Sequence, residues 1–201
     1  MTEANAKTLA SYNQHVPEYV AGTPNVVSGA TKSWIDAALN GLPRDARLLE
    51  VGSGHGRDAL YIQQQGYDVA CTDATPAFVE HLRGLGLQAE HFNALTDAVP
   101  SAYDLILANA VLLHFTRAEF AMALAKMAGA LEQDGRFAFT LKRGNGEEWS
   151  TAKLNAPRYF CYWEPEALPV LLAQAGFSSW SIDAVTTERA HADWISIVAR
   201  K

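Results

Sequence analysis

Short apolar runs alternate with amphipathic stretches along most of the chain, and this pattern predicts an α/β fold. The short runs are rich in β-favouring residues, as buried strands are, whereas the longer stretches repeat apolar residues at helical spacing. The predicted strands are residues 46–51, 67–72, 88–92, 103–108, 136–141, 179–185 and 194–199. The predicted helices are residues 4–21, 28–41, 58–65, 76–85, 119–131 and 164–175.

The end of the chain departs from this alternation. The last two predicted strands, residues 179–185 and 194–199, are joined by a polar turn and not by a helix. A short connection of this kind suits an antiparallel pair, because a parallel pair needs a longer crossover. Residues 142–149 contain two glycines and are interpreted as a polar loop.

A glycine-rich turn follows the first predicted strand. Gly52, Gly54 and Gly56 have the spacing G-x-G-x-G, and Glu50 lies two residues before them. Glycines without Cβ atoms let a ligand approach the backbone, and the first N–H groups of the next helix point at it. The alternative is a tight turn without a ligand. Dinucleotide-binding folds favour a different spacing, G-x-G-x-x-G.

Polar residues end two further predicted strands. Asp73 stands 21 residues after Gly52, where a carboxylate at the end of the second strand accepts hydrogen bonds from ribose hydroxyls. The alternative role for Asp73 is an N-cap of helix 76–85, whose start contains a proline. Asn109 follows strand 103–108, at the sheet edge where open α/β sheets bind ligands.

Residues 4–21 are predicted as a helical segment in front of this pattern. Tyr12 and Tyr19 lie seven positions apart and share one helix face. One interpretation is a helix packed on the core by this aromatic stripe. The other makes residues 1–27 a lid over a bound ligand, with both tyrosines contacting substrate.

Three cationic residues cluster in the second half of the chain. Lys142 and Arg143 follow strand 136–141, and Arg158 lies in an aromatic segment whose Tyr159, Tyr162 and Trp163 are expected to exclude water. Such cations suit a carboxylate or phosphate ligand. The alternative is ordinary surface charge.

Composition limits the classes of function. The 201 residues suit one domain over the whole chain, and 49% apolar and 19% charged residues are typical of a globular protein. A net charge of −6 disfavours a nucleic-acid partner, because nonspecific nucleic-acid binders are normally basic. We find no stretch typical of a membrane span or signal peptide, and the two cysteines match no metal spacing. We therefore expect a cytoplasmic protein, monomeric or homodimeric, with no metal.

The motifs and their order resemble the seven-stranded, Rossmann-like methyltransferases that use S-adenosylmethionine (SAM). The resemblance covers about residues 28–201 and rests on the glycine loop with Glu50, on Asp73, on Asn109 and on the closing hairpin. It implies a three-layer α/β/α sandwich around a seven-stranded, mostly parallel sheet with an antiparallel last strand. The segments Leu-Lys-Arg-Gly-Asn-Gly-Glu and Arg-Tyr-Phe-x-Tyr-Trp are similar to a bacterial branch of small members.

The resemblance also implies a function, methyl transfer from SAM to a small-molecule acceptor. The implied cofactor contacts are Glu50, Gly52, Ser53, Gly54, Gly56, Arg57, Asp73, Ala74, Asn93, Ala94 and Asn109. Asn93 departs from the family's usual aspartate at the adenine and keeps a hydrogen-bonding group without the charge. Arg57 is expected to reach the methionine carboxylate, unless it only begins a solvated helix.

His114 is the candidate catalytic residue. It lies just beyond Asn109, and the sequence leaves open a proton acceptor, a substrate contact or a packed core histidine. Two rival functions also stay open. A nicotinamide-dependent oxidoreductase fits Asp73 but not the glycine spacing, and a non-catalytic SAM-binding protein would share every motif.

Overall fold

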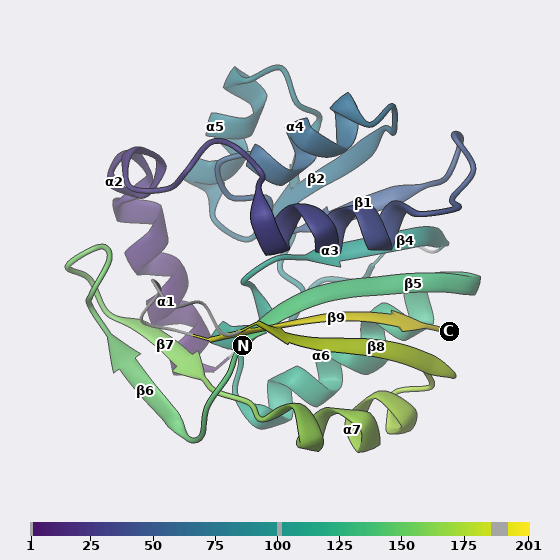
Figure 1. Ribbon diagram of the computed structural model, residues 1–201. Helices are drawn as coiled ribbons and strands as arrows, with labels where there is room; N and C mark the ends of the chain where they lie inside the picture. The colour runs from purple at the N-terminus through teal and green to yellow at the C-terminus, as the bar shows by residue number, and fades with distance from the viewer. Residues whose placement is uncertain (1, 100–101, 186–192) are drawn as a thin grey trace.

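A central sheet carries the functional residues, and helices lie on both of its faces. The computed structural model describes residues 2–99, 102–185 and 193–201. Within them, seven strands form one sheet in the order β3-β2-β1-β4-β5-β9-β8 (Figure 1). The five strands from β3 to β5 in this order run parallel to one another. Strand β9 pairs antiparallel with both β5 and β8. The predicted fold class, with its antiparallel last strand, is confirmed.

The elements follow the predicted order, with ends shifted by a few residues. The strands of the sheet are β1 (Leu48–Val51), β2 (Val69–Asp73), β3 (Ala89–His91), β4 (Tyr103–Ala108), β5 (Leu131–Lys142), β8 (Ser179–Val185) and β9 (Trp194–Arg200). The helices of the α/β part are α3 (Gly29–Leu39), α4 (Arg57–Gln64), α5 (Pro76–Gly84), α6 (Arg117–Ala130) and α7 (Leu168–Gln174), with short 3-10 turns η1 (Leu112–His114) and η2 (Pro165–Ala167).

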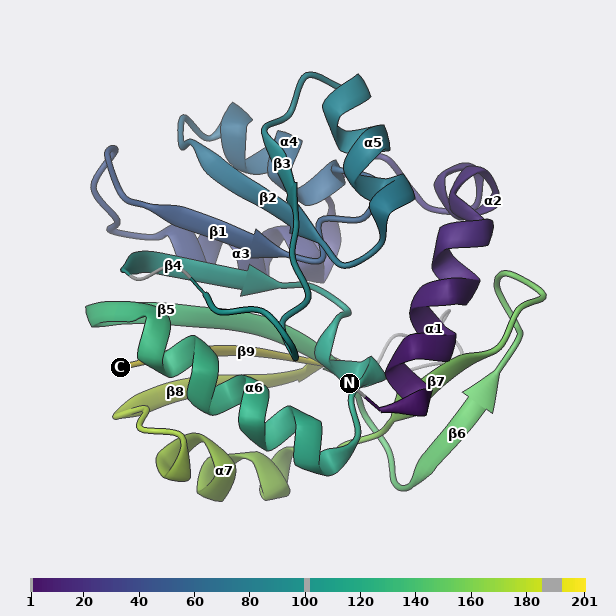
Figure 2. The same cartoon turned by 180° about the vertical axis from the view of Figure 1, so that it is seen from behind.

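The two faces of the sheet have separate apolar cores. Helices α3, α4 and α5 cover one face, where Trp34, Ile62 and Leu82 pack against sheet residues. Helices α6 and α7 cover the other, where Phe120 packs against Phe139. Figures 1 and 2 show α3 and α6 on opposite sides of the strands. Burial on both faces explains why β1 is apolar apart from its one acid.

The N-terminal segment differs from the single helix that the sequence predicts. It forms α1 (Glu3–Gln14) and α2 (Val16–Ala21), with a break at His15. Pro17 occupies the first turn of α2, where a proline is tolerated, and it lacks the N–H that a continuous helix would need. Figure 2 shows α1 standing at the end of the sheet toward which the parallel strands point.

A second, two-stranded sheet was not predicted. Strands β6 (Glu147–Ser150) and β7 (Arg158–Cys161) pair antiparallel beside α1 (Figures 1 and 2). The prediction of a polar loop over residues 142–149 is therefore wrong for its second half. The glutamates of β6 are exposed and Trp149 is its one apolar residue, so this strand lacks the repeated apolar residues by which strands are detected in sequence. No helix in the described part of the chain is long and apolar enough to cross a membrane.

Candidate active site

The glycine loop connects β1 to α4 and leaves open space at one residue. Gly52 and Gly54 have φ angles of 69° and 53°, in the left-handed region that favours glycine. A Cβ on Gly52 would come within 2.4 Å of Val111, whereas a Cβ on Gly54 would meet nothing closer than Tyr19 at 3.9 Å. Gly52 is therefore needed for packing, and Gly54 presents bare backbone to a cavity.

Gly56 serves the packing of the helices, and the cofactor contact implied for it stays a prediction. It precedes α4 with a φ of 83°, and a Cβ there would lie 3.0 Å from side-chain atoms of both Leu82 and Leu87. It does not line either of the two pockets described below. The third glycine thus lets α4 pack closely against the α5 region.

Asp73 fastens the glycine loop to the end of β2. Its carboxylate accepts one hydrogen bond from the backbone N–H of Gly54, at 2.9 Å, and another from that of Thr75, at 2.8 Å. Burial raises the pKa of Asp73, and the two amides oppose this shift. Thr75, not Asp73, is the N-cap of α5. Asp73 also lines the first pocket, where a ligand can reach it. Its contact to ribose stays a prediction.

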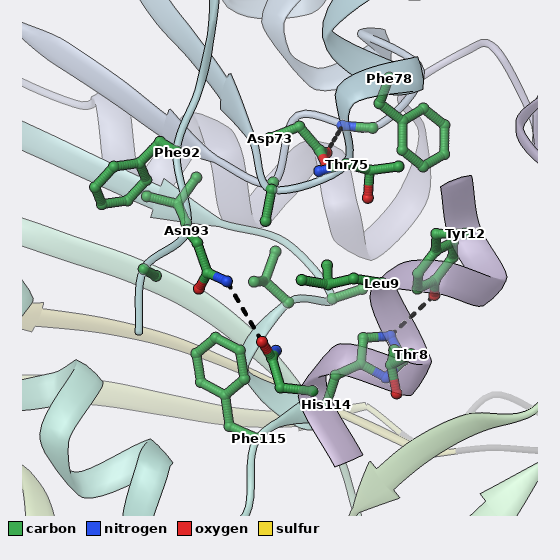
Figure 3. A pocket seen from close by; sticks show the side chains of 18 of the residues that line it. Thr8, Leu9, Tyr12, Asp73, Thr75, Phe78, Phe92, Asn93, His114 and Phe115 are labelled. Carbon is green, nitrogen blue, oxygen red and sulfur yellow. Dashed lines mark hydrogen bonds between the residues drawn. The ribbon is translucent and has the colours of Figure 1, made fainter. Parts of the chain in front are cut away.

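The first pocket lies between the strand ends and α1 (Figure 3). Seven of the predicted cofactor residues line it: Gly52, Gly54, Asp73, Ala74, Asn93, Ala94 and Asn109. Besides Tyr12, Tyr19 and His114, the other lining residues are ones that the sequence did not single out, and most of them are apolar: Asn5, Thr8, Leu9, Val51, Thr75, Phe78, Phe92, Ala110, Val111 and Phe115. A pocket with apolar walls and a few polar groups at its ends suits a flat, partly polar ligand.

Helix α1 covers this pocket through polar contacts, and Tyr12, with Tyr19 of α2, also packs against the buried Phe78. Thr8 Oγ1 accepts from the backbone N–H of Tyr159 at 3.0 Å, and Ser11 Oγ donates to the carbonyl of Pro157 at 2.6 Å. Asn5 contacts Asn93 on the opposite wall. Tyr12 and Tyr19 meet edge to face, with ring centroids 5.6 Å apart, and both line the pocket. The segment therefore occupies the position expected of a lid.

Buried acids lie on the other side of the glycine loop. Glu50 is only 2% exposed, and its Oε2 has no hydrogen-bond partner among the described residues. Burial, together with the nearby Asp58, raises the pKa of Glu50 well above its usual range. Asp58 accepts from Arg57 Nε at 2.7 Å and from Asn109 Nδ2 at 2.6 Å. Asn109 is thus fixed at the strand end, and Arg57 is paired to an acid and not simply solvated.

A second, larger pocket of about 1010 Å³ opens beyond this loop and carries cationic side chains. Lys142 and Arg158, two of the three predicted acceptor cations, line it together with Arg57 and with Lys153, which the sequence analysis missed. Glu50, Ser53 and Asp58 lie on the same walls. Arg143 does not: it forms an exposed ion pair with Glu164, at 3.0 Å, and lines neither pocket. We refer to this second pocket as the cationic cleft.

Strand periodicity explains which aromatic residues reach the cationic cleft. In β7, Arg158 and Phe160 face the cleft, whereas Tyr159 does not line it. Trp163 packs against Phe120, with centroids 4.5 Å apart. Because successive strand residues point to opposite sides, a correct β7 assignment would have identified Phe160 in place of Tyr159.

His114 is a buried, neutral side chain held at both ring nitrogens. Its Nδ1 lies 2.6 Å from the carbonyl of Tyr159 and therefore carries the proton, so Nε2 accepts from the Tyr12 hydroxyl at 2.9 Å (Figure 3). Burial, with smaller effects of Arg158 and Lys142, lowers the pKa of His114 to about 3. Arg158 Nη1 donates in turn to the Tyr12 hydroxyl at 3.2 Å.

The two pockets meet along a common wall. Seven residues line both of them: Tyr12, Tyr19, Gly52, Gly54, Asn109, Ala110 and His114. A ligand that fills the first pocket therefore reaches the cationic cleft at the glycine loop, between α1 and η1. We call these seven residues the junction.

A family comparison identifies this arrangement. The sequence model of a methyltransferase domain matches residues 14–182, most of the chain. The chain belongs to this methyltransferase family. The family predicted from the glycine loop and the strand ends is thereby confirmed, and the oxidoreductase alternative is not favoured. No curated protein matches the chain.

Solved structures with low sequence identity share the fold of this methyltransferase. A complex of DhpI with SAM and HEP has a TM-score of 0.74 and 17% identity, covering 100% of both chains. A 1,6-didemethyltoxoflavin-N1-methyltransferase from Burkholderia thailandensis, solved with 1,6-didemethyltoxoflavin and S-adenosylhomocysteine, has a TM-score of 0.69 and 22% identity, covering 100% of this chain and 91% of that one. The cyclase SpnF has a TM-score of 0.70 and 19% identity over 100% and 96%.

The residues of this methyltransferase fit SAM at three points. Asp73 and the bare backbone of Gly54 border the first pocket, as a ribose needs. Apolar walls next to Asn93 suit the adenine. On the cleft side of the glycine loop, the unpartnered Oε2 of buried Glu50 matches an ammonium group such as the one on the methionine end.

Proposed function

We propose that this methyltransferase transfers a methyl group from SAM to a small molecule that carries an anionic group. The junction is the observation that carries the proposal. It connects a pocket with the features for an adenosine to a cleft with unbalanced cationic side chains, so a donor and an acceptor can meet there. Tyr12 and Tyr19 stand at this meeting point.

SAM supplies a methyl group bound to a positively charged sulfur. The chain's own residues need to align an acceptor atom with that methyl and to keep water away, and both contribute strongly to the rate of such displacements. Phe160, Trp34 and Trp194 supply apolar surface in the cationic cleft, and Arg158 and Lys142 supply charge.

Ligand-induced stabilisation tests the cofactor. SAM and S-adenosylhomocysteine at a hundredfold excess over Kd should stabilise the protein by about 2.7 kcal/mol. For a chain of this length that is a rise in Tm of roughly 5–10 °C. NAD should leave Tm unchanged. Stabilisation by NAD but not by SAM would contradict the proposal.

Turnover separates an enzyme from a silent binder. A panel of small carboxylates, phosphonates, amines and alcohols is incubated with SAM, and release of S-adenosylhomocysteine is measured. We expect release with anionic members. A protein that binds SAM and releases no S-adenosylhomocysteine with any acceptor, including those in a cell extract, would be a non-catalytic SAM-binding protein.

A further inference from the structure

The chemistry of the junction bears on which atom receives the methyl group. An alcohol or amine acceptor has a proton to lose, so a base next to the methyl would assist it. A carboxylate or phosphonate oxygen already carries the electron pair. The titratable groups at the junction and in the cleft therefore discriminate between these acceptors.

The side chains at the junction are poor proton acceptors. His114 Nε2 is already occupied by the Tyr12 hydroxyl, and an imidazolium there would face Arg158 and Lys142. Tyr12 holds its own proton, because burial raises its pKa. Among the acids of the cleft, Asp58 is bound by Arg57 and Asn109. Glu50 lies at the end that fits the methionine ammonium.

The cations beside the junction, Arg158 and Lys142, form no ion pair within the described residues. Burial and Arg158 lower the pKa of Lys142, and the nearby Glu148, whose carboxylate accepts from the Tyr162 hydroxyl, only partly opposes this shift. Arg158 is 6% exposed, and its Nε has no hydrogen-bond partner among the described residues. The Lys142 ammonium lies over the Phe160 ring, 4.2 Å from its centroid, and Arg158 lies over the same ring at 5.2 Å. Two cations held this close over one ring, one of them buried, are costly without a counter-ion.

We propose that the methyl acceptor is an oxygen of the substrate's own anionic group, a carboxylate or phosphonate, held by Arg158 and Lys142 beside the junction. The inference rests on the proposed function. The acceptor oxygen attacks the methyl carbon, the carbon–sulfur bond breaks, and its electron pair stays on sulfur. The products are a methyl ester and S-adenosylhomocysteine. No proton is transferred, so no base is needed.

Lys153 is the rival as a base. It stands at the cleft rim, where its Nζ donates to Thr23 Oγ1 at 2.6 Å and lies 3.9 Å from the centroid of Tyr19. Partial burial, with Arg158 and Arg57, lowers the pKa of Lys153 to about 8. If neutral Lys153 took a proton, the rate would rise with pH through about 8. At saturating SAM, methyl transfer to a carboxylate gives no such rise, because carboxylates are ionised throughout this range.

The product identifies the acceptor atom. The protein is incubated with SAM labelled in the methyl group and a deproteinised cell extract that has been separated by anion exchange into acidic and non-acidic fractions. Benzoate and phenylphosphonate are tested beside benzamide and benzyl alcohol. We expect label only in products from acidic compounds. Mild alkali should release it as methanol from a carboxylate ester, and phosphorus NMR should detect a phosphonate ester.

The possible failures differ from one another. A labelled N-methyl or C-methyl product of an acidic compound would overturn the inference and leave the proposed function intact. Transfer only to non-acidic compounds would overturn both. With a carboxylate acceptor, a rate that rises through pH 8 would favour a base and also overturn the inference. Failure of every fraction to accept label would contradict the proposed function itself. Binding gives a second readout, measured by calorimetry on the S-adenosylhomocysteine complex. The acid that accepts the label should bind to this complex, and the methyl ester of that acid should bind at least roughly tenfold more weakly.

Discussion

The two sides of the junction are built in different ways. The glycine-loop side uses backbone groups and residues at the ends of consecutive strands, so its parts lie within residues 50–109 apart from the covering residues of α1, Tyr19 and the η1 region. The cationic cleft takes side chains from α3, the glycine loop, β5, β7 and β9, which are widely separated in sequence. The first side follows from the backbone geometry of the fold itself. The second is where members of one family can differ, since side chains change without disturbing the sheet.

The largest effect is expected from Gly54→Val, which fills the backbone side. The valine side chain would occupy the ligand's space. Because the backbone at position 54 has a positive φ, a valine there would also cost about 1–2 kcal/mol of stability. We expect SAM binding to weaken by more than about 4 kcal/mol, a thousandfold, in calorimetry. Gly129→Val is the matched control, because Gly129 has open space around it in α6. Unchanged affinity in the Gly54 variant would remove the loop from the cofactor site.

Arg158→Leu removes the main charge of the side-chain side. We expect kcat/KM for the acceptor to fall roughly a hundredfold, the effect of losing a charge-assisted contact in a desolvated site, while SAM affinity stays unchanged. Arg143→Leu, which removes an exposed arginine outside the cleft, should have little effect. Loss of SAM binding in the Arg158 variant would instead assign this residue to the cofactor side or to the fold.

Asp73→Ala tests the strand-end carboxylate. Loss of a charge-assisted contact to ribose should weaken SAM binding by about 1.5–3 kcal/mol, ten- to a hundredfold. Because the backbone N–H groups of Gly54 and Thr75 lose their acceptor, Tm should fall as well. Asp104→Ala is the comparison, since Asp104 also accepts from a backbone N–H, that of Arg47, but lines neither pocket. A large drop in Tm with normal SAM affinity would leave Asp73 a purely structural role.

The smallest effect is expected at the junction. Tyr12→Phe keeps the ring but removes the hydroxyl that links Arg158 to His114. Of these two hydrogen bonds, the one from Arg158 bears on the acceptor, and one hydrogen bond contributes about 0.5–1.5 kcal/mol, so we expect turnover to fall by roughly two- to tenfold. Tyr61→Phe, which removes a hydroxyl bound to Asp36, serves as the control. An effect on SAM affinity as large as that of Asp73→Ala would place Tyr12 on the cofactor side.

The sequence was most informative where function depends on local spacing. Strand, glycine turn and helix form a continuous unit, and the acid 21 residues after Gly52 lies at the end of the neighbouring strand because β1 and β2 are in parallel register. These relations follow from backbone geometry and so can be predicted from one chain.

Long-range contacts account for what the sequence analysis missed. Arg143 and Arg158 look alike in sequence, yet one pairs with Glu164 at the surface and the other is buried against Tyr12 of the N-terminal helix. Nothing in the spacing of the segment 142–163 reveals the β6–β7 pairing that separates them. The break at His15 could have been predicted from the sequence, because Pro17 marks it directly.

The polar attachment of α1 has a kinetic consequence. Its buried residues are Asn5, Thr8 and Ser11, so lifting this helix exchanges hydrogen bonds with the protein for hydrogen bonds with water and takes no fully buried apolar side chain of its own out of the protein. Such an element opens at a lower free-energy cost than the core helices. We expect the amides of α1 to exchange with deuterium long before those of α6, and to slow markedly once S-adenosylhomocysteine is bound. Departure of the spent cofactor would then proceed at the rate of this opening, and a fast chemical step would not raise kcat beyond it.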